Sequence, residues 1–509
     1  MLLSCHHSLV TMSSVRCIFF TRPPVKQIIP KDVIMSTIRS SFVFTLSFVL
    51  TLSLLTLPTP AADKPVKVYI LSGQSNMVGI GQVTGGGSRW GSEFSNPILS
   101  VYSGKYDSNT DYDKIEPMNT VQLEVFGGNK PSPYPGGGTQ IVRGFIQIKT
   151  TGVYEFRPGY GESTHNMMEV DGQEVYRREP GKDAVHKHIK LVEGKKVPFK
   201  ITYFTDHANG LGWIARVDIP GTLETVVKQD GKFPYLVDKP GNWIARDDVW
   251  YKGVVTATAN KSLSIGCGAS NNNIGPELGF GHIVGDHHDE PVLILKASQG
   301  NRSLGWDYLP PDSERFEHEG YIYAGYKDSP ARWEIGTKPE PINWYAGKQY
   351  DDCFTATHDV LNNFDKEFPH WKSRGYEIAG FVWWQGHKDG GEPYARRYEQ
   401  NLVHFIKTLR KGFDTPNAPF VIATIGFDGW NMEGPHKKVA EAQLAVSGDR
   451  GKYPEFKGNV LSVETRDFWR EPDVSPKNQG FHYNQNAETY MLVGEALGNG
   501  MIQLLKANR

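Results

Sequence analysis

The sequence has few cysteines and no excess of charge of one sign. Its 509 residues include only 4 cysteines, which excludes a fold held together by many disulfides. The 55 basic and 56 acidic side chains nearly cancel, which excludes nucleic-acid binding driven by overall charge. It also lacks a phosphate-binding glycine loop and a Cys-x-x-Cys pair. A chain of 509 residues is long enough for two or three globular domains, and its hydrophobic content of 39% is enough to give each of them a core.

Long hydrophobic runs are absent except for one near the N-terminus, at residues 42–57. At about 16 residues it is short for a membrane span, which needs about 20. Arg39 precedes the run and small residues follow it. A basic start, an apolar centre and a small-residue end are typical of a secretory signal peptide. An uncleaved membrane anchor is the alternative.

The region 1–62 is therefore expected to be a signal peptide region that is absent from the mature protein. Met35 lies where such a peptide begins, so we expect residues 1–34 to be a wrongly assigned start. Cleavage before Asp63 would give a secreted or periplasmic protein with no stable insertion into a membrane.

Two cysteines, Cys267 and Cys353, lie beyond the expected cleavage point. In an oxidising compartment they are candidates for one disulfide, but the sequence does not place their Cα atoms within bonding distance. Two free, buried thiols are the alternative, and the sequence leaves both open.

Strands and helices alternate over most of the mature chain. Residues 67–72 form an apolar run typical of a buried strand. The later segments are expected as helices at 275–287, 353–366, 393–411, 435–446 and 485–506, and as strands at 291–296, 376–384, 419–425 and 459–463. This alternation predicts an α/β fold with a parallel sheet and helices on both of its faces.

A different pattern interrupts this α/β sequence. Residues 126–138 are rich in proline and glycine, and short runs of period-two alternation follow in 139–228. We therefore expect an inserted all-β sandwich with its core in 139–228. The predicted division is a hydrolase domain in two parts, 63–125 and 233–509, around a linker and insert at 126–232.

Four of the predicted loops carry groups suited to acyl transfer. In open parallel sheets, ligands bind at the carboxyl ends of the strands. Ser75 follows the first strand, Gly300 the strand at 291–296 and Gln385 the strand at 376–384, while His482 lies just before the last helix. A hydroxyl, a backbone amide, a carboxamide and an imidazole would together supply a nucleophile, oxyanion donors and a base.

Several sequence blocks around these loops, each weak by itself, occur in an order that is specific to one family. They are Val68–Met77, Gly275–Gly281, Leu293–Leu304, Trp384–Gly386 and the late His482, in this order. In these blocks the chain resembles the sialate O-acetylesterase and acetylxylan-esterase-like carbohydrate esterases, a branch of the SGNH hydrolases. The resemblance covers roughly 64–100 and 240–507. It implies a flavodoxin-like, three-layer α/β fold.

The resemblance also implies roles for single residues. Ser75 would be the nucleophile and His482 the general base, and Gly300 and Gln385 would join the Ser75 amide in the oxyanion site. The implied reaction removes O-acetyl groups from acetylated polysaccharide or sialic acid through an acyl-enzyme, with no cofactor.

The chain departs from the family pattern at two positions near the site. Relatives carry Asp three residues before the histidine, where this sequence has Gln479. Either Gln479 orients the imidazole in a Ser–His dyad, or an acid from elsewhere does so. The candidate acids are Asp473, Glu464 and Asp467. Relatives also often carry Glu at the position of His387, which is expected near the substrate.

Residues 152–156, 170–175 and 191–197 of the insert resemble the protective-antigen-type β-sandwich that accompanies many glycan-active enzymes. Sugar-binding members hold Ca²⁺ with paired aspartates, but residues 161–166 contain no such pair. The histidines at 282, 287 and 288 do not have the spacing of a zinc site. We therefore expect no metal. The insert's role in binding glycan or Ca²⁺ is left open.

Two rival functions are compatible with the same residues. One is a catalytically inactive glycan-binding protein on the esterase fold, because the usual acid is missing. The other is an esterase of small, unrelated esters. The sequence specifies neither the sugar, nor the acyl position, nor the oligomeric state.

Overall fold

The computed structural model describes residues 64–103, 109–123, 138–159, 165–204 and 212–507. The predicted signal peptide region 1–62 lies outside these ranges, as do nearly all of the Pro/Gly-rich segment 126–138 and most of the segment 161–166. Within the described ranges, no helix is long and apolar enough to cross a membrane.

A seven-stranded sheet forms the centre of the α/β part. Its spatial order is β15 (Asn260–Leu263), β14 (Arg246–Gly253), β17 (Val292–Ser298), β1 (Val66–Gly73), β21 (Tyr376–Trp384), β22 (Phe420–Ala423) and β23 (Val460–Val463). All neighbours are parallel except β15 and β14. Every residue of β17 is buried, as expected for a strand that is covered on both faces. The predicted α/β fold with a parallel sheet is confirmed.

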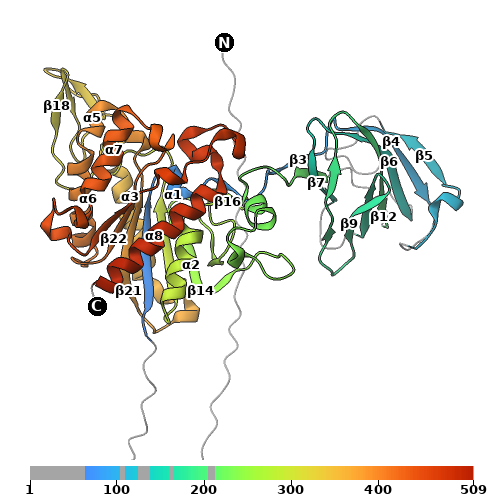
Figure 1. Cartoon of the computed structure of the whole chain (residues 1–509), viewed down its shortest axis with the longest axis horizontal. Helices are drawn as coiled ribbons and strands as arrows, with labels where there is room; N and C mark the ends of the chain where they lie inside the picture. Colours follow the sequence, from blue (N-terminus) through green and yellow to red (C-terminus); the bar gives the residue numbers. More distant parts are fainter. Residues whose placement is uncertain (1–63, 104–108, 124–137, 160–164, 205–211, 508–509) are drawn as a thin grey trace, which may run out of the picture. The chain divides into compact units, whose positions relative to one another are not determined.

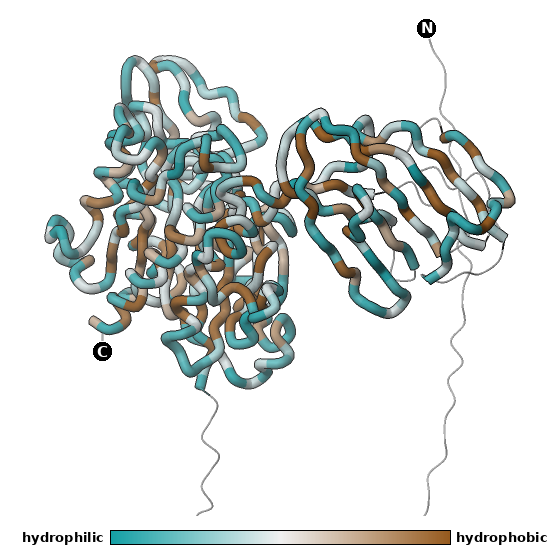
Figure 2. Tube along the Cα trace, turned by 45° about the vertical axis from the view of Figure 1, so that its right-hand side comes forward, coloured by the Kyte–Doolittle hydropathy of each residue, from teal (hydrophilic) through white to brown (hydrophobic). Residues whose placement is uncertain are grey.

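Helices cover both faces of this sheet. On one face lie α2 (Glu277–His287) and α8 (Ala487–Ala507), which Figure 1 shows crossing in front of the strands. On the other lie α3 (Lys348–Asn362) and α6 (Tyr398–Gly412), with α7 (Gly434–Ala445) beside α6. Successive side chains of β1 point to opposite faces of the sheet and therefore meet different helices. Tyr69 packs against Phe280 of α2, while Ser72 lies on the side of Cys353 of α3. Hydrophobic stretches of the chain run through the α/β part (Figure 2).

Some predicted boundaries differ from those observed. The helix expected at 353–366 begins at Lys348 and is followed by a separate short helix, α4 (Phe364–Glu367). The helix expected at 393–411 is divided into α5 (Glu392–Ala395) and α6. The first turn of α3 is mostly polar, so hydrophobic periodicity did not reveal it.

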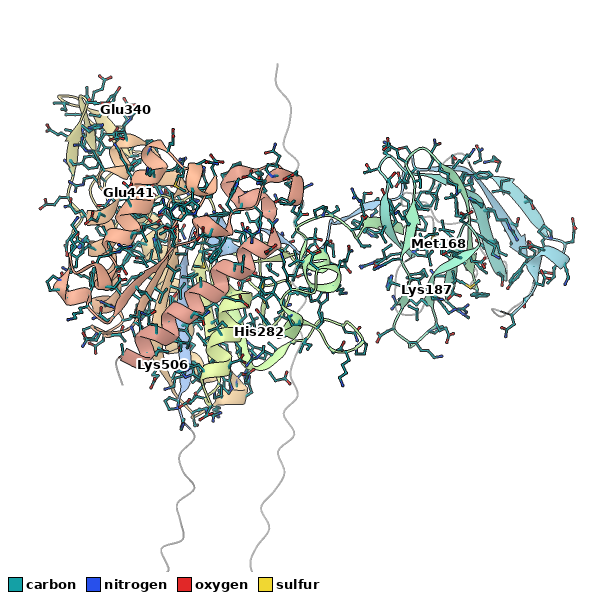
Figure 3. The ribbon with its side chains drawn as sticks, viewed as in Figure 1. Met168, Lys187, His282, Glu340, Glu441 and Lys506 are labelled. Atoms are coloured by element: carbon teal, nitrogen blue, oxygen red, sulfur yellow. The ribbon has the colours of Figure 1, made fainter. Side chains whose placement is uncertain are left out.

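A second region consists of two antiparallel sheets. The larger has the order β10 (Val185–His186), β9 (Gln173–Arg178), β8 (Asn166–Val170), β12 (Lys196–Tyr203), β6 (Thr139–Gln147), β4 (Phe94–Tyr102) and β5 (Asn119–Gln122). The smaller has β11 (Ile189–Leu191), β7 (Gly152–Pro158), β13 (Gly212–Arg216) and β3 (Gly87–Arg89). Side chains of both sheets share one hydrophobic core, with Phe156 from the smaller sheet and Met168 from the larger (Figure 3).

The extent of this region corrects both predicted domain boundaries. Strands β3, β4 and β5 lie within 63–125, yet they pair in the antiparallel sheets. Conversely, Leu223 and Val227 belong to the core of the parallel sheet, although they lie within 126–232. The Pro/Gly-rich segment comes between β5 and β6, two strands of one sheet, so composition alone misplaced the boundary.

Cys267 and Cys353 are both free and buried. The alternative of a disulfide between them is therefore wrong. Burial raises the pKa of each thiol to about 11, so both are protonated and unreactive at neutral pH.

Candidate active site

The site lies where the parallel strands end. Gly73 at the end of β1 pairs with Ser298 of β17 on one side and with Trp384 of β21 on the other. The loops after these three strands therefore begin side by side. The chain also changes direction across the sheet here, because β17 lies on one side of β1 and β21 on the other, and such a switch point is where open α/β sheets bind ligands.

Ser75 is the first residue of the short helix α1 (Ser75–Val78). The turn that leads to it requires glycine at position 73, where φ is +154° and a Cβ would lie 2.1 Å from the carbonyl oxygen of Trp384. Ser75 is only 9% exposed. The close packing of the turn therefore fixes the predicted nucleophile at the edge of the sheet.

Gly300 lies directly against this serine. A Cβ at position 300 would be 3.6 Å from the Cβ of Ser75. The backbone N–H groups of Ser75 and Gly300 have no hydrogen-bond partner among the described residues. Two unpaired amides beside a hydroxyl are what an oxyanion site needs. The structure thus brings together Ser75 and Gly300, two of the residues predicted for the oxyanion site.

A buried ion pair supports the turn and short helix at residues 73–78, called here the serine turn. Lys296 of β17 and Glu277 of α2 are both fully buried, with 2.8 Å between Nζ and Oε2. The Lys296 ammonium also donates to the carbonyl oxygens of Val78 and Cys267, at 2.7 and 2.9 Å. Because Val78 ends α1, these bonds hold the far end of the helix that begins with Ser75.

His482 lies in a segment of 3-10 turns, η11 (Gly480–Gln485), directly before α8. Two side chains link this segment to the serine turn. The amide of Asn76 donates to the carbonyl oxygen of Phe481 at 3.4 Å, and the hydroxyl of Tyr490 reaches Asn76 Oδ1 at 3.0 Å and the carbonyl oxygen of His482 at 3.4 Å. Burial lowers the pKa of His482, so the imidazole is neutral at pH 7 and able to accept a proton.

Gln479 is the residue that contacts the imidazole. Its Oε1 lies 3.2 Å from Nδ1 of His482. The candidate acids are engaged elsewhere: Glu464 pairs with Arg466 at 2.6 Å, Asp467 accepts from Trp430 at 2.6 Å, and Asp473 is exposed to solvent. Among the described residues, none of the three makes a hydrogen bond or ion pair with His482.

Gln385 is buried, and its side-chain amide already has acceptors. Nε2 lies 2.6 Å from Oδ2 of Asp389, 2.9 Å from the carbonyl oxygen of Arg302 and 3.2 Å from Oε1 of Gln74. The last contact places it one residue from Ser75. Its predicted role as an oxyanion donor stays a prediction, and the contacts observed are those of a residue that joins loops.

Asp389 is a component of the site that the sequence did not single out. Its carboxylate accepts from the backbone N–H of Leu304 at 2.8 Å and of Gly305 at 2.7 Å, besides Gln385. It thereby ties the loop after β21 to the loop after β17. Burial raises its pKa to about 7, against the effect of these three donors. The only sequence signal was an acidic residue in a loop already expected at the site.

His387 lies among aromatic rings near His482. Its ring centroid lies 5.0 Å from that of His436, 5.1 Å from that of Phe427 and 5.7 Å from that of Phe481. Burial, together with the neighbouring His436 and His482, lowers its pKa to about 4. The ring is therefore neutral over the whole physiological range.

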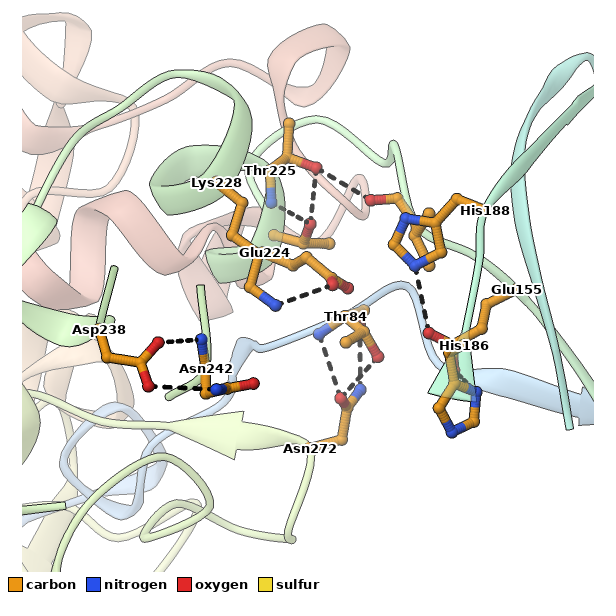
Figure 4. A network of polar contacts seen from close by, with 12 residues as sticks. Thr84, Glu155, His186, His188, Glu224, Thr225, Lys228, Asp238, Asn242 and Asn272 are labelled. Carbon is orange, nitrogen blue, oxygen red and sulfur yellow. Dashed lines mark hydrogen bonds and ion pairs between the residues drawn. The ribbon is translucent and has the colours of Figure 1, made fainter. Parts of the chain in front are cut away.

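The histidines away from this site have other surroundings. His282 lies on α2 (Figure 3), where its ring packs at 4.7 Å from that of Tyr235. In the antiparallel region, Glu155 lies between His186 and His188 (Figure 4). In the described part of the chain, no three histidine, cysteine or acidic side chains gather as a possible metal-ligand set.

Comparison with known proteins gives a family. A family model described as "Carbohydrate esterase, sialic acid-specific acetylesterase" matches residues 250–503. A search of curated proteins finds no match.

Solved structures show weaker likenesses. A protein from Arabidopsis thaliana is 17% identical, with 51% of this chain and 82% of that one covered and a TM-score of 0.33. A carbohydrate acetylesterase from Xanthomonas citri is 10% identical over 71% and 72%, with a TM-score of 0.32. A family two carbohydrate esterase from Cellvibrio japonicus is 9% identical over 83% and 99%, with a TM-score of 0.27. TM-scores this low add nothing to the assignment.

The matched family is the one that the sequence blocks resemble, and the matched residues include the blocks around Gly300, Gln385 and His482. The chain belongs to the carbohydrate esterase family of sialic acid-specific acetylesterases, and it is a carboxylic ester hydrolase.

Proposed function

We propose that the protein removes O-acetyl groups from carbohydrate through an acetyl-enzyme on Ser75, with His482 as general base. His482 Nε2 takes the proton from the Ser75 hydroxyl while Oγ attacks the ester carbonyl. The sugar oxygen leaves with that proton. Water, deprotonated by the same nitrogen, then releases acetate and restores the serine.

The observation that carries this proposal is the position of Ser75. It lies in a glycine-dependent turn at the switch point, with Gly300 against it and two unpaired backbone amides beside it. Such amides stabilise the oxyanion, and removing one such donor typically costs about 10²–10³ in rate. Gln479 is proposed as the group that orients His482, because its Oε1 faces Nδ1.

A carbohydrate substrate is supported by an exposed tryptophan on the loop after β22. Trp430 is 61% exposed, its Nε1 donates to Asp467, and the guanidinium of Arg466 lies 4.1 Å from its ring centroid. These two contacts hold the indole in place while leaving much of it accessible. An exposed aromatic ring on a loop at the carboxyl end of the sheet is suited to stacking on a sugar ring.

The organisation of the chain completes the proposal. The antiparallel sheets over residues 87–216 are proposed as a protective-antigen-type insert in a flavodoxin-like SGNH domain. Residues 1–62 are proposed as a secretion signal region, with translation starting at Met35. Sequencing of the secreted protein should find Asp63 or a close neighbour at its N-terminus, and a protein that retains Met1 would contradict this.

Acetate release from acetylated xylan, pectin and sialoglycan tests the enzymatic proposal. The wild-type protein should release acetate from at least one of them, and Ser75→Ala should lower kcat by about 10⁴-fold or more. Ser262→Ala, on the edge strand β15, is the matched control and should retain full activity.

The rival functions predict other outcomes in the same assay. A glycan-binding protein would retain polysaccharide without releasing acetate. An esterase of unrelated small esters would hydrolyse a simple acetyl ester faster than any acetylated polysaccharide. Either result would overturn the proposed function.

A further inference from the structure

Three glutamine side chains form a hydrogen-bonded series that ends at the catalytic histidine. Nε2 of Gln82 donates to Oε1 of Gln485 at 2.6 Å. Nε2 of Gln485 donates to Oε1 of Gln479, also at 2.6 Å. The same Oε1 of Gln479 lies 3.2 Å from Nδ1 of His482. Gln82 comes from β2 (Gly81–Gln82), which follows the serine turn and pairs with β16 (Asn273–Ile274).

The direction of these bonds decides which end of the Gln479 amide faces the imidazole. A glutamine amide accepts through its oxygen and donates through its nitrogen. Because Gln485 donates to Oε1, this oxygen is held toward both Gln485 and His482. If the amide turned over, its NH₂ group would face the NH₂ group of Gln485, and two donors would meet without an acceptor.

The orientation of Gln479 in turn selects the histidine tautomer. An oxygen opposite Nδ1 can only accept, so Nδ1 carries the proton and Nε2 keeps its lone pair. A base that takes a proton from serine needs this tautomer, and a triad held in the wrong one loses about 10⁴ in kcat. Gln82 acts one step earlier, because its donation to Oε1 of Gln485 turns the NH₂ group of Gln485 toward Gln479.

We propose that Gln485 and Gln82 are positioning residues that, through Gln479, hold His482 in the tautomer required of a base. The proposal rests on the proposed role of His482. The series takes the place of a triad carboxylate by geometry, without its charge. Aligned amides also polarise one another, which strengthens the acceptor that faces the imidazole.

The test uses two substitutions of nearly equal size at position 485. In Gln485→Glu the carboxylate cannot donate to Gln479 Oε1 and instead attracts its NH₂ group, which reverses the amide. We expect kcat to fall by about 10²-fold, since a general base contributes 10²–10⁴. In Gln485→Met the orientation of the Gln479 amide is no longer fixed, and we expect kcat to fall by about 10-fold. In both variants KM should be unchanged.

A spectroscopic measurement separates positioning from a merely structural role. ¹⁵N NMR of histidine-labelled protein at pH 8 should show His482 as the Nδ1–H tautomer in the wild type and as the Nε2–H tautomer in Gln485→Glu, with His482→Gln identifying the signal. Gln82→Met should shift the tautomer balance in the same direction by a smaller amount. Gln503→Glu, an exposed glutamine on α8, should change neither kcat nor the tautomer.

The outcomes distinguish this inference from the proposed function. Wild-type kcat and an Nδ1–H tautomer in Gln485→Glu would overturn the positioning role, and so would an Nε2–H tautomer in the wild type. If instead the wild type shows Nδ1–H and responds to Gln485→Glu but releases no acetate, the positioning stands and the esterase proposal fails. Should Gln485→Glu not fold, Gln485→Met and Gln82→Met decide by the same two readouts.

Discussion

The two halves of the site are held in place by different chemistry. Charged groups support the half that contains Ser75 and Gly300: Lys296 with Glu277 beneath α1, and Asp389 between the loops after β17 and β21. Neutral carboxamides support the half that contains His482. They are Asn76, Gln82, Gln479, Asn484, Gln485 and Asn486.

This difference fits what the proposed mechanism requires of each half. The serine half must hold backbone amides at fixed positions, and buried ions bind several backbone groups at once. The histidine half must leave an imidazole free to gain and lose a proton. Burial lowers the pKa of His482, and neutral neighbours add no charge that would stabilise the imidazolium.

Removing one charge from the serine half should have the largest effect on stability. In Lys296→Met, Glu277 is left buried without its counter-ion, and breaking a buried pair costs about 3–5 kcal/mol. We expect a marked fall in the free energy of unfolding, measured by denaturant titration, together with loss of activity. The double variant Lys296→Met, Glu277→Met should recover part of this stability, and no recovery would contradict the assignment.

Asp389 should show the next largest effect. In Asp389→Asn the NH₂ group would face one of the N–H groups that the carboxylate now accepts, which leaves a buried donor unpaired. The free energy of unfolding should fall by about 1–3 kcal/mol, and kcat should fall because the Gly300 loop is no longer fixed. Asp312→Asn, a loop aspartate that makes no hydrogen bond or ion pair in the described part of the chain, is the control. A fully active Asp389→Asn variant would show that activity does not depend on the hydrogen bonds by which Asp389 joins the loops after β17 and β21.

A charge introduced into the histidine half should move the pH profile rather than the stability. In Gln479→Glu, a carboxylate beside Nδ1 stabilises the imidazolium and raises the pKa of His482. The wild-type kcat/KM should decline on the acid side with a midpoint below about 6.5, the usual value for histidine. In the variant this midpoint should move upward, so activity at pH 6 falls while the alkaline plateau is retained. An unchanged midpoint would contradict contact between residues 479 and 482.

Trp430→Ala should give the smallest change. If the exposed indole stacks on a sugar ring, its loss should raise KM for an acetylated polysaccharide by about 2- to 10-fold, the equivalent of 0.5–1.5 kcal/mol. Hydrolysis of a small acetyl ester should be unaffected, because such a substrate has no sugar ring on which the indole could stack. Equal effects on both substrates would show that the tryptophan acts on the fold instead.

Local sequence patterns predicted the parts of this molecule that depend on near neighbours. The apolar strands β1, β17 and β21 and the loops that follow them were predicted because each is one continuous segment. Gln479 was identified because it lies three residues before His482, and the structure places it against the imidazole. Strand pairing by β4 and β5 was missed, since it is decided by partners distant in the chain.

The supporting residues were missed for the same reason. Gln82 and Gln485 are separated by 403 positions, and Asp389 contacts amides 84 and 85 positions away. No periodicity or motif connects residues at such separations. Their types, carboxamides and one carboxylate in loops, are also common on any protein surface, so only the folded arrangement reveals what they contact.

The nucleophile is the central claim, and covalent labelling tests it most directly. A serine-directed phosphonate should modify the wild-type protein once, and peptide mass spectrometry should locate the adduct on Ser75. Labelling should be abolished in Ser75→Ala and strongly slowed in His482→Ala, because the hydroxyl then lacks its base. An adduct on another serine, or folded protein that no phosphonate labels, would contradict the account.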